Sequence, residues 1–524
     1  MKFRSTGIGI VFTALGLTLF GFNARPVALA AQPTGFVASP GEFPAPPVQE
    51  GDFRRGPIVD ISNPDPMASF GVGGENWDQA TNETELETTL TVNPANPRNF
   101  ATIWRAHDGT ADAVSVTLDG GATWQIVAIP GISAGAGGTY PDTADPWISF
   151  APNGTLYAAN LAFGNGPSDT YVSKSTDGGL SWGAPTLVSG IGVDFADRPS
   201  VTADPGNSNY VYAGWDNGIF VGAATNNFTR TTDGGQTWEA PRSIYTAPAG
   251  NGIWGPQTMA LPNGTLVSVF TELILTSFNV NSIPQYEYAL SVQRSTDKGQ
   301  TWSAPVKVAA QRPRIDPDPQ DFPWFATVTD PKNAHGIAAA GMGSSVAVNS
   351  RNGNLYAVWI DARFSGGRYN SIAFSQSTDD GSNWSRPIKV NQTPDDILRL
   401  DRQAFNPTVA VAANGTIGVS YYDLRFDTTG RGCSVDYWLA TCSPTSRDSS
   451  ADPENWGNEI RLTNMSFDIQ QAAGSSIGGN SSYWLGDYNG LAASGSSFVA
   501  TWTQPLAGSP DRILFRKVRL SPND

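Results

Sequence analysis

The stretch STDGGLSW, residues 175–182, recurs in five versions along this chain and decides its fold. The others are TLDGGATW (117–124), TTDGGQTW (231–238), STDKGQTW (295–302) and STDDGSNW (377–384). In each, an Asp stands two residues before a Gly and five before a Trp. The Asp can accept hydrogen bonds from amides of its own turn, and the Gly supplies a positive φ. Five equivalent turns cannot meet at one substrate, so we predict scaffold and not catalysis.

The structural residues of this motif fall into two sets. Its aspartates are Asp119, Asp177, Asp233, Asp297 and Asp379, and its tryptophans are Trp124, Trp182, Trp238, Trp302 and Trp384. We expect each Trp to pack on the neighbouring sheet, because only a large side chain fills such a wedge.

A pair of strands precedes each motif. Examples are DPWISFAPNGTLYAANL (145–161) and GSSVAVNSRNGNLYAVW (343–359), each a short strand, an Asn/Gly turn and a second strand. A third strand leads into the motif, and a fourth, such as APTLVSG (184–190), leaves it. Four antiparallel strands repeated about every fifty residues or more describe a β-propeller blade.

The units number seven. The sixth has PENWGNEIRLT (453–463) as a remnant of the motif, and the seventh lacks a fourth strand. GPIVDIS (56–62) resembles the missing strand, and pairing it into the last blade would leave no open sheet edge. We therefore predict an all-β chain with one seven-bladed propeller over residues 58–524. Six blades, with one unit an insertion, is the alternative.

The N-terminus reads as a targeting segment. Lys2 and Arg4 precede an apolar stretch at 7–22, and Ala-Leu-Ala at 28–30 suits a signal peptidase. The apolar run is short for a bilayer span. We predict a signal peptide at 1–31 and a Pro- and Gly-rich linker at 32–57. The protein would then be secreted, periplasmic or held at the cell surface, without a membrane span in the mature chain.

Charge restricts the partners. Loss of residues 1–31 removes three positive charges, on Lys2, Arg4 and Arg25, and no negative ones, so the formal net charge falls from −15 to −18. Such an acidic protein binds nucleic acid and anionic membranes poorly. We expect a monomer that acts on an extracellular glycan or polysaccharide, and any anionic ligand would need a local arginine cluster.

Cysteine and histidine are scarce. Cys433 and Cys442 are the two cysteines, and in an exported chain we expect a local disulfide between them. With His107 and His335 as the only histidines, zinc chemistry is disfavoured, and we expect no cofactor. Asp316, Asp318 and Asp321 could hold a structural calcium, although the alternating prolines favour a plain exposed loop.

Five S/T-x-D-x-G-x-x-W motifs resemble the Asp-box (BNR) repeats of the sialidase superfamily, over about residues 80 to 520. The resemblance is specific for a propeller fold. It is much less specific for activity, because Asp boxes also occur in other glycosidases, in sorting receptors and in proteins without known chemistry.

The resemblance also implies a site on the axis, at the face opposite the boxes. A sialidase-like mechanism uses three arginines for the sugar carboxylate, a Tyr nucleophile beside a Glu, and an Asp as acid and base. The candidates are Arg105, Arg198 and Arg402 for the clamp, Tyr421 or Tyr422 with Glu272 for the nucleophile, and Asp108 or Asp145 for the acid. The family's F/Y-R-I-P motif is missing, and IWRAHD carries over Arg105 alone. The repeated D-x-R at 361–363 and 423–425 could instead form salt bridges between adjacent blades.

Three functions stay open, and whether the chain is an enzyme stays open with them. The first is an exo-α-sialidase-like glycoside hydrolase. The second is a non-catalytic propeller that binds a glycan or protein, with exposed aromatics such as Trp254 or Trp484. The third is a polysaccharide lyase that uses His107 and a Tyr.

Overall fold

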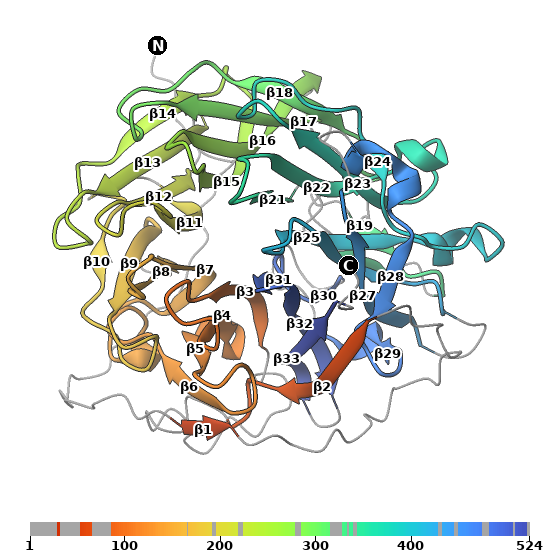
Figure 1. The fold of residues 1–524 in the computed structure, drawn as a ribbon, viewed down its shortest axis with the longest axis horizontal. Helices are drawn as coiled ribbons and strands as arrows, with labels where there is room; N and C mark the ends of the chain where they lie inside the picture. Colours follow the sequence, from red (N-terminus) through yellow and green to blue (C-terminus); the bar gives the residue numbers. More distant parts are fainter. Residues whose placement is uncertain are drawn as a thin grey trace, which may run out of the picture.

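Antiparallel β-sheets follow one another along the chain and are arranged around a common centre, with the first strand of each sheet innermost (Figure 1). The computed structural model describes residues 29–31, 53–64, 85–164, 166–190, 195–217, 224–277, 285–314, 327–332, 335–338, 343–427, 432–444, 449–473, 482–506 and 509–520. In these ranges helix is confined to 3-10 turns, and no helix is long and apolar enough to cross a membrane.

The first four sheets are meanders of neighbouring strands. Their members are β3 (Leu86–Val92), β4 (Phe100–Ala106), β5 (Ala111–Thr117) and β6 (Trp124–Ala128), with β1 (Leu29–Ala31) outside β6; β7 (Asp142–Phe150), β8 (Leu156–Phe163), β9 (Asp169–Ser175) and β10 (Thr186–Leu187); β11 (Asp197–Ala203), β12 (Val211–Asp216), β13 (Thr225–Thr231) and β14 (Arg242–Thr246); and β15 (Gly252–Ala260), β16 (Leu266–Ser277), β17 (Gln285–Ser295) and β18 (Val306–Gln311).

The remaining sheets continue the pattern. They are β21 (Ser344–Val348), β22 (Leu355–Asp361), β23 (Ser371–Ser377) and β24 (Ile388–Lys389); β25 (Ala404–Val411), β26 (Ile417–Asp423), β27 (Ser434–Cys442) and β28 (Asn458–Arg461), with β29 (Phe467–Asp468) also on β27; and β31 (Gly490–Ser494), β32 (Ser497–Leu506), β33 (Ser509–Arg519) and β2 (Arg54–Asp60). A small sheet joins β19 (Thr327–Thr329), β20 (Gly336–Ala338) and β30 (Tyr483–Trp484).

The N-terminal strand completes the last sheet, as the sequence predicts. β2 pairs antiparallel with β33, so the last sheet is built from segments more than 400 residues apart, and β2 lies beside β33 in Figure 1. The last and first sheets are neighbours, because the Thr88 and Thr501 hydroxyls are 3.1 Å apart. Most of the predicted signal peptide, and Asp316, Asp318 and Asp321, lie outside the described residues.

All five boxes lie between the third and fourth strands of their sheets, and their aspartates serve the turn. Asp233 accepts from the amides of Gln236 and Thr237, both at 2.9 Å, and from the hydroxyls of Thr231 and Thr237. The hydroxyl and amide of Thr237 hold the pKa of Asp233 well below its usual range. The other four aspartates accept equivalent bonds from the amides of their own turns.

The boxes also join each sheet to the one before it. The Trp124 ring meets the edge of Phe515 at 4.8 Å between centroids, and Trp302 meets Phe228 at 5.2 Å. In the sixth sheet the predicted remnant does the same, because Trp456 is fully buried and lies edge-on to Phe374 at 4.8 Å. The box tryptophan is therefore a wedge between sheets.

The predicted disulfide is wrong. Cys433 directly precedes β27 and Cys442 ends it, and both thiols are free and buried. Nine steps along an extended strand separate their Cα atoms by about 30 Å. A disulfide needs Cα atoms about 4.4–6.8 Å apart. The sequence spacing suggested a local disulfide, but the segment between the cysteines is one continuous strand.

Substitution of the second box glycine tests the contact between sheets. Gly120 and Gly121 both have positive φ, but a Cβ at Gly121 would lie 2.7 Å from the Phe515 ring, whereas none of the described atoms lies within 4 Å of one at Gly120. Gly120→Ala should cost about 1 kcal/mol for backbone strain alone. Gly121→Ala should cost a further 1–3 kcal/mol or so for overpacking. Urea unfolding measures both, and equal losses would contradict the packing role.

The free thiols can be counted chemically. We expect two thiols per chain to react with a thiol reagent after unfolding without reductant, and almost none in the folded protein, because burial raises the pKa of both, that of Cys442 to about 12. Reductant should leave the melting temperature unchanged. Fewer than two reactive thiols in the unfolded, unreduced chain would support the predicted disulfide after all.

Candidate functional site

A bulge interrupts the innermost strand of five sheets at the same point. Register shifts occur at Leu86/Thr89, Ala144/Trp147, Asp197/Ser200, Trp254/Gln257 and Phe405/Thr408. Within each, the residue after the first named position has a left-handed backbone, and these residues are Glu87, Asp145, Arg198, Gly255 and Asn406. A bulge re-aims a side chain, and a left-handed non-glycine residue is a strained conformation typical of functional sites.

Three of these bulged residues meet carboxylates or cations from other sheets near the centre. One oxygen each of Glu87, Asp145 and Asp487 lies within 4.8 Å of the others. The Asp145 amide donates to Glu87 Oε2 at 3.1 Å, and Tyr488 donates its hydroxyl to Asp145 Oδ1 at 3.1 Å. Glu87 and Asp145 are buried, while Asp487 and Tyr488 are half-buried. We call Glu87, Asp145, Arg198, Asp487 and Tyr488 the axial cluster.

Arg198 binds this cluster directly. Its Nη1 donates to Asp487 Oδ2 at 2.7 Å and to the Tyr488 hydroxyl at 3.2 Å, and its guanidinium lies 3.7 Å from the centre of the Trp254 ring. The Trp484 indole donates to the other oxygen of Asp487 at 3.1 Å. Asp487 is thus held by a cation and an indole.

The buried carboxyls favour their protonated forms. Burial, and then the charge of Asp145, raises the pKa of Glu87 well above its ordinary value, against the opposing effect of Arg105. Burial also raises the pKa of Asp145, although Arg198 opposes it. Burial and Asp145 raise the pKa of Tyr488. Glu87 and Asp145 together therefore retain a proton at pH values where isolated carboxyls have lost theirs.

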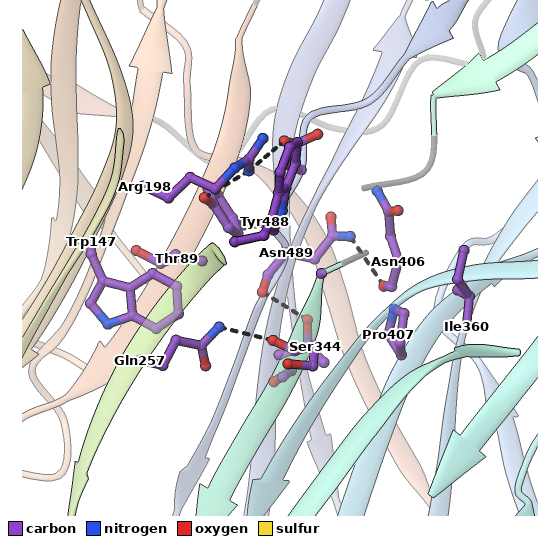
Figure 2. Close-up of a pocket in the computed structure, with 16 residues that line it drawn as sticks. Thr89, Trp147, Arg198, Gln257, Ser344, Ile360, Asn406, Pro407, Tyr488 and Asn489 are labelled. Carbon is purple, nitrogen blue, oxygen red and sulfur yellow. Dashed lines mark hydrogen bonds and ion pairs between the residues drawn. The ribbon is translucent and has the colours of Figure 1, made fainter. Parts of the chain in front are cut away.

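A cavity opens beside the cluster (Figure 2). Arg198, Asp487, Tyr488 and Asn489 line one part of it, and Trp147, Gln257 and Asn406 come from other sheets. Gln257 Nε2 reaches the Ser344 carbonyl at 2.8 Å, which joins the walls across the gap between two sheets. The cavity thus combines aromatic surface with amides and charged groups, as small-molecule sites do.

The structure brings two of the three predicted clamp arginines together with the predicted acid Asp145, but not the third arginine. Arg105 lies over the Trp484 ring at 5.7 Å and lowers the pKa of Glu87 and Asp145, so it shares the region of Arg198 and Asp145. Arg402 does not join them. Its Nε and Nη2 donate to the Ile397 carbonyl within its own loop, at 2.9 and 2.7 Å. The predicted three-arginine clamp therefore does not form with Arg402.

The predicted nucleophile pair is also separated. Glu272 accepts from Tyr245 and Ser291, both at 2.8 Å, whereas Tyr421 bonds to Glu459. Tyr422 is fully buried and donates to the Thr503 carbonyl at 2.7 Å. These tyrosines lie inside a sheet stack because their strand, β26, is covered on both faces. The backbone of Asp108 lies on η2 (His107–Gly109), and its side chain lies outside the described part.

In each D-x-R motif the Asp and the Arg form a salt bridge with each other. Asp361 pairs with Arg363 at 2.6 Å and Asp423 with Arg425 at 2.8 Å, so the predicted bridges between adjacent blades are replaced by bridges within one motif. Trp254 and Trp484 are buried and not exposed, which removes them as surface aromatics for a binding function. His107 Nε2 lies 4.0 Å from Glu85 Oε1. His107 is not among the described residues that line the cavity, as a catalytic residue of a lyase would be.

Sequence reasoning missed two members of the site. Glu87 stands at the bulge of β3, but Thr88 follows it, whereas Asp145, Arg198 and Asn406 precede prolines that mark the bulge. Tyr488 stands in GDYNG (486–490), directly before β31. The oxygens of Glu87, Asp145 and Asp487 could ligate a cation, although Arg198 already supplies positive charge to Asp487.

The fold and boxes define an all-β, propeller-like protein that resembles the sialidase superfamily. No family model matches the sequence, and no curated protein matches it. Solved structures similar to it include the Hadza microbial sialidase Hz136 (13% identity, 95% of this chain and 97% of that chain, TM-score 0.42), a Penicillium chrysogenum α-L-arabinanase (14%, 73% and 95%, 0.42) and a Dyadobacter fermentans protein of unknown function (13%, 72% and 94%, 0.40). Similarity this low assigns no activity.

A buried carboxyl beside the site should make stability depend on pH. Asp112, opposite Arg105 on β5, accepts from Asn160 at 2.7 Å, and burial raises its pKa from 3.8 to about 8. The folded state then holds the proton more tightly, so stability is lost as pH rises from about 4 towards 8. Relative to Asp112→Asn, the free energy of unfolding of the wild type should fall by about 1 kcal/mol per pH unit between pH 5 and 7.5. A difference independent of pH would contradict the raised pKa.

Proposed function

We propose that this chain is an exported, seven-bladed Asp-box β-propeller that hydrolyses glycosidic bonds of extracellular glycans at the axial cluster. The supporting observation is the meeting of Glu87, Asp145 and Asp487 beside a cavity. Glycoside hydrolysis uses two carboxyl groups, one as proton donor and the other as nucleophile or base.

The environments of the carboxyls suggest the division of roles. Asp487 lines the cavity and binds Arg198, so it suits the nucleophile. Glu87 and Asp145 retain a proton. In the relay we propose, the Tyr488 hydroxyl, which lines the cavity, turns to give its own proton to the leaving oxygen, and the protonated Asp145 returns one to the Tyr488 oxygen. Oxygens within 4.8 Å are nearer to the carboxyl separation of retaining enzymes, about 5–5.5 Å, than to that of inverting ones.

The charge of the site favours a neutral sugar. Glu87, Asp145 and Asp487 repel an anionic substrate, and both nearby arginines already contact protein groups, Arg198 through Asp487 and Arg105 over Trp484. A sugar carboxylate would have to displace Asp487 from Arg198. The exo-α-sialidase activity that the resemblance implies is therefore the less supported form of the reaction.

One observation keeps a sialidase-type reaction as a second candidate. The Tyr488 hydroxyl bonds both a carboxylate, Asp145, and a cation, Arg198, which is the arrangement that activates a phenol as nucleophile. In that reaction Asp145 accepts the phenol proton, Tyr488 attacks the anomeric carbon, and Arg198 with Arg105 binds the sugar carboxylate.

Two substitutions and two substrate types separate the candidates. With neutral aryl glycosides, Asp487→Ala should lower kcat by about 10³-fold or more, and azide should restore turnover as a glycosyl azide. Tyr488→Phe should lower kcat about 10²–10⁴-fold, without azide rescue, because it removes only the proton relay. Asp395→Asn, on an exposed loop, is the matched control.

The second candidate would instead be established if the wild type hydrolyses a fluorogenic sialoside but no neutral glycoside, and if Tyr488→Phe abolishes that hydrolysis. Wild-type protein without activity on a panel of both types would contradict the hydrolase proposal. Activity that survives both substitutions would place the reaction elsewhere.

A further inference from the structure

A basic groove lies at the seam between the last and first sheets, on the box side. Arg54 of β2, with Lys517 and Arg519 of β33, lines it from the last sheet, and Gly120, Gly121 and Ala122 of the first box line it from the other side. Arg98, whose Nη2 donates to the Asp119 carbonyl, stands next to this turn. Because the axial cluster lies at the opposite ends of the sheets, the groove is separate from the proposed active site.

The cations of the groove lack acidic partners in the described part of the chain. The side chains of Arg54, Lys517 and Arg519 make no hydrogen bond or ion pair there, and Lys517 lies over the Phe100 ring at 5.5 Å. The nearest acid in the turn, Asp119, is already bound by the amides of Ala122 and Thr123. In a chain of formal net charge −15, such a group of unpaired cations is exceptional.

Equivalent positions at other seams show what Lys517 lacks. The third-strand residue three before the box Asp is Lys174, Arg230 and Arg294 in the second, third and fourth sheets. Lys174 donates to the Gly234 carbonyl of the next box at 2.6 Å, Arg230 to the Lys298 carbonyl, also at 2.6 Å, and Arg294 lies 3.9 Å from Asp380. Each of those cations meets an oxygen of the next sheet, and Lys517 does not.

The groove therefore carries positive charge that an external oxyanion would neutralise. Burial, and then the charges of Arg519 and Arg98, lowers the pKa of Lys517, which shows that the cations repel one another across the groove. Guanidinium groups match the oxygens of phosphate and sulfate, and an ammonium adds a point charge. A single tetrahedral group can contact several of these cations at once.

We propose that this groove binds a phosphate or sulfate group, and that it attaches the protein to an anionic ligand independently of catalysis at the axis. A compact oxyanion suits it better than nucleic acid, because a long polyanion would extend from the groove onto an acidic surface.

The test measures binding of inorganic phosphate to the full chain by isothermal titration at low ionic strength. Saturable binding is expected, weakening as salt is added. Lys517→Gln/Arg519→Gln should weaken it at least tenfold. The matched control is Lys307→Gln/Arg386→Gln, which removes the same charge from exposed positions elsewhere and should change the affinity less than twofold. Melting temperatures check that both variants fold. Arg54→Gln removes one positive charge from the other strand of the groove and tests its contribution independently.

Glucose 6-phosphate and glucose 6-sulfate distinguish the sources. Tighter binding of the first assigns the groove to phosphate esters, tighter binding of the second to sulfate esters, and either supports the proposal. No saturable binding of any of the three anions by the wild type would overturn it, as would equal losses in the groove variant and its control. Because no arm requires turnover, its failure is distinct from failure of the hydrolase proposal.

Discussion

The left-handed bulge near the start of five of the inner strands is the constraint on which the rest of the structure depends. It places Glu87, Asp145, Arg198 and Asn406 in a conformation that costs a non-glycine residue about 1–2 kcal/mol each. The residue two positions on links the sheets, since Thr89 donates to the Pro146 carbonyl and Ser200 to the Pro256 carbonyl. The same backbone feature thus orients side chains towards the axis and places hydroxyls that form hydrogen bonds between neighbouring sheets.

The two ends of each sheet are consequently used for different work. At the box end, aspartates such as Asp233 are half-buried and have their oxygens bonded by their own turn. The motif can therefore repeat in sheet after sheet, and each copy adds a tryptophan that packs between sheets. At the bulge end, carboxylates such as Asp145 are buried and converge, so each sheet must contribute a different residue. The same residue type is scaffold at one end and a titrating group at the other.

The sequence predicted the features that repeat and missed those that depend on convergence. The boxes, the strands between them and the final strand from β2 followed from local patterns, and prolines after Asp145 and Arg198 marked two site residues. Arg402, Tyr421 and Glu272 stood at plausible points of their repeats, but partners in their own loops or sheets hold them. Glu87 and Tyr488 carry no local signal, because only the ring brings them together.

The last sheet departs furthest from the repeat, and this departure has a physical cause. Its four strands come from both chain ends, so it has no turn between third and fourth strands to hold a box. The sequence of this sheet is therefore not constrained by the box motif. The segment before β31 supplies Asp487 and Tyr488 to the axial cluster. At the opposite end of the sheet, β33 and β2 supply the cations of the basic groove. Closure by two distant segments is thus also what allows one sheet to carry both candidate sites.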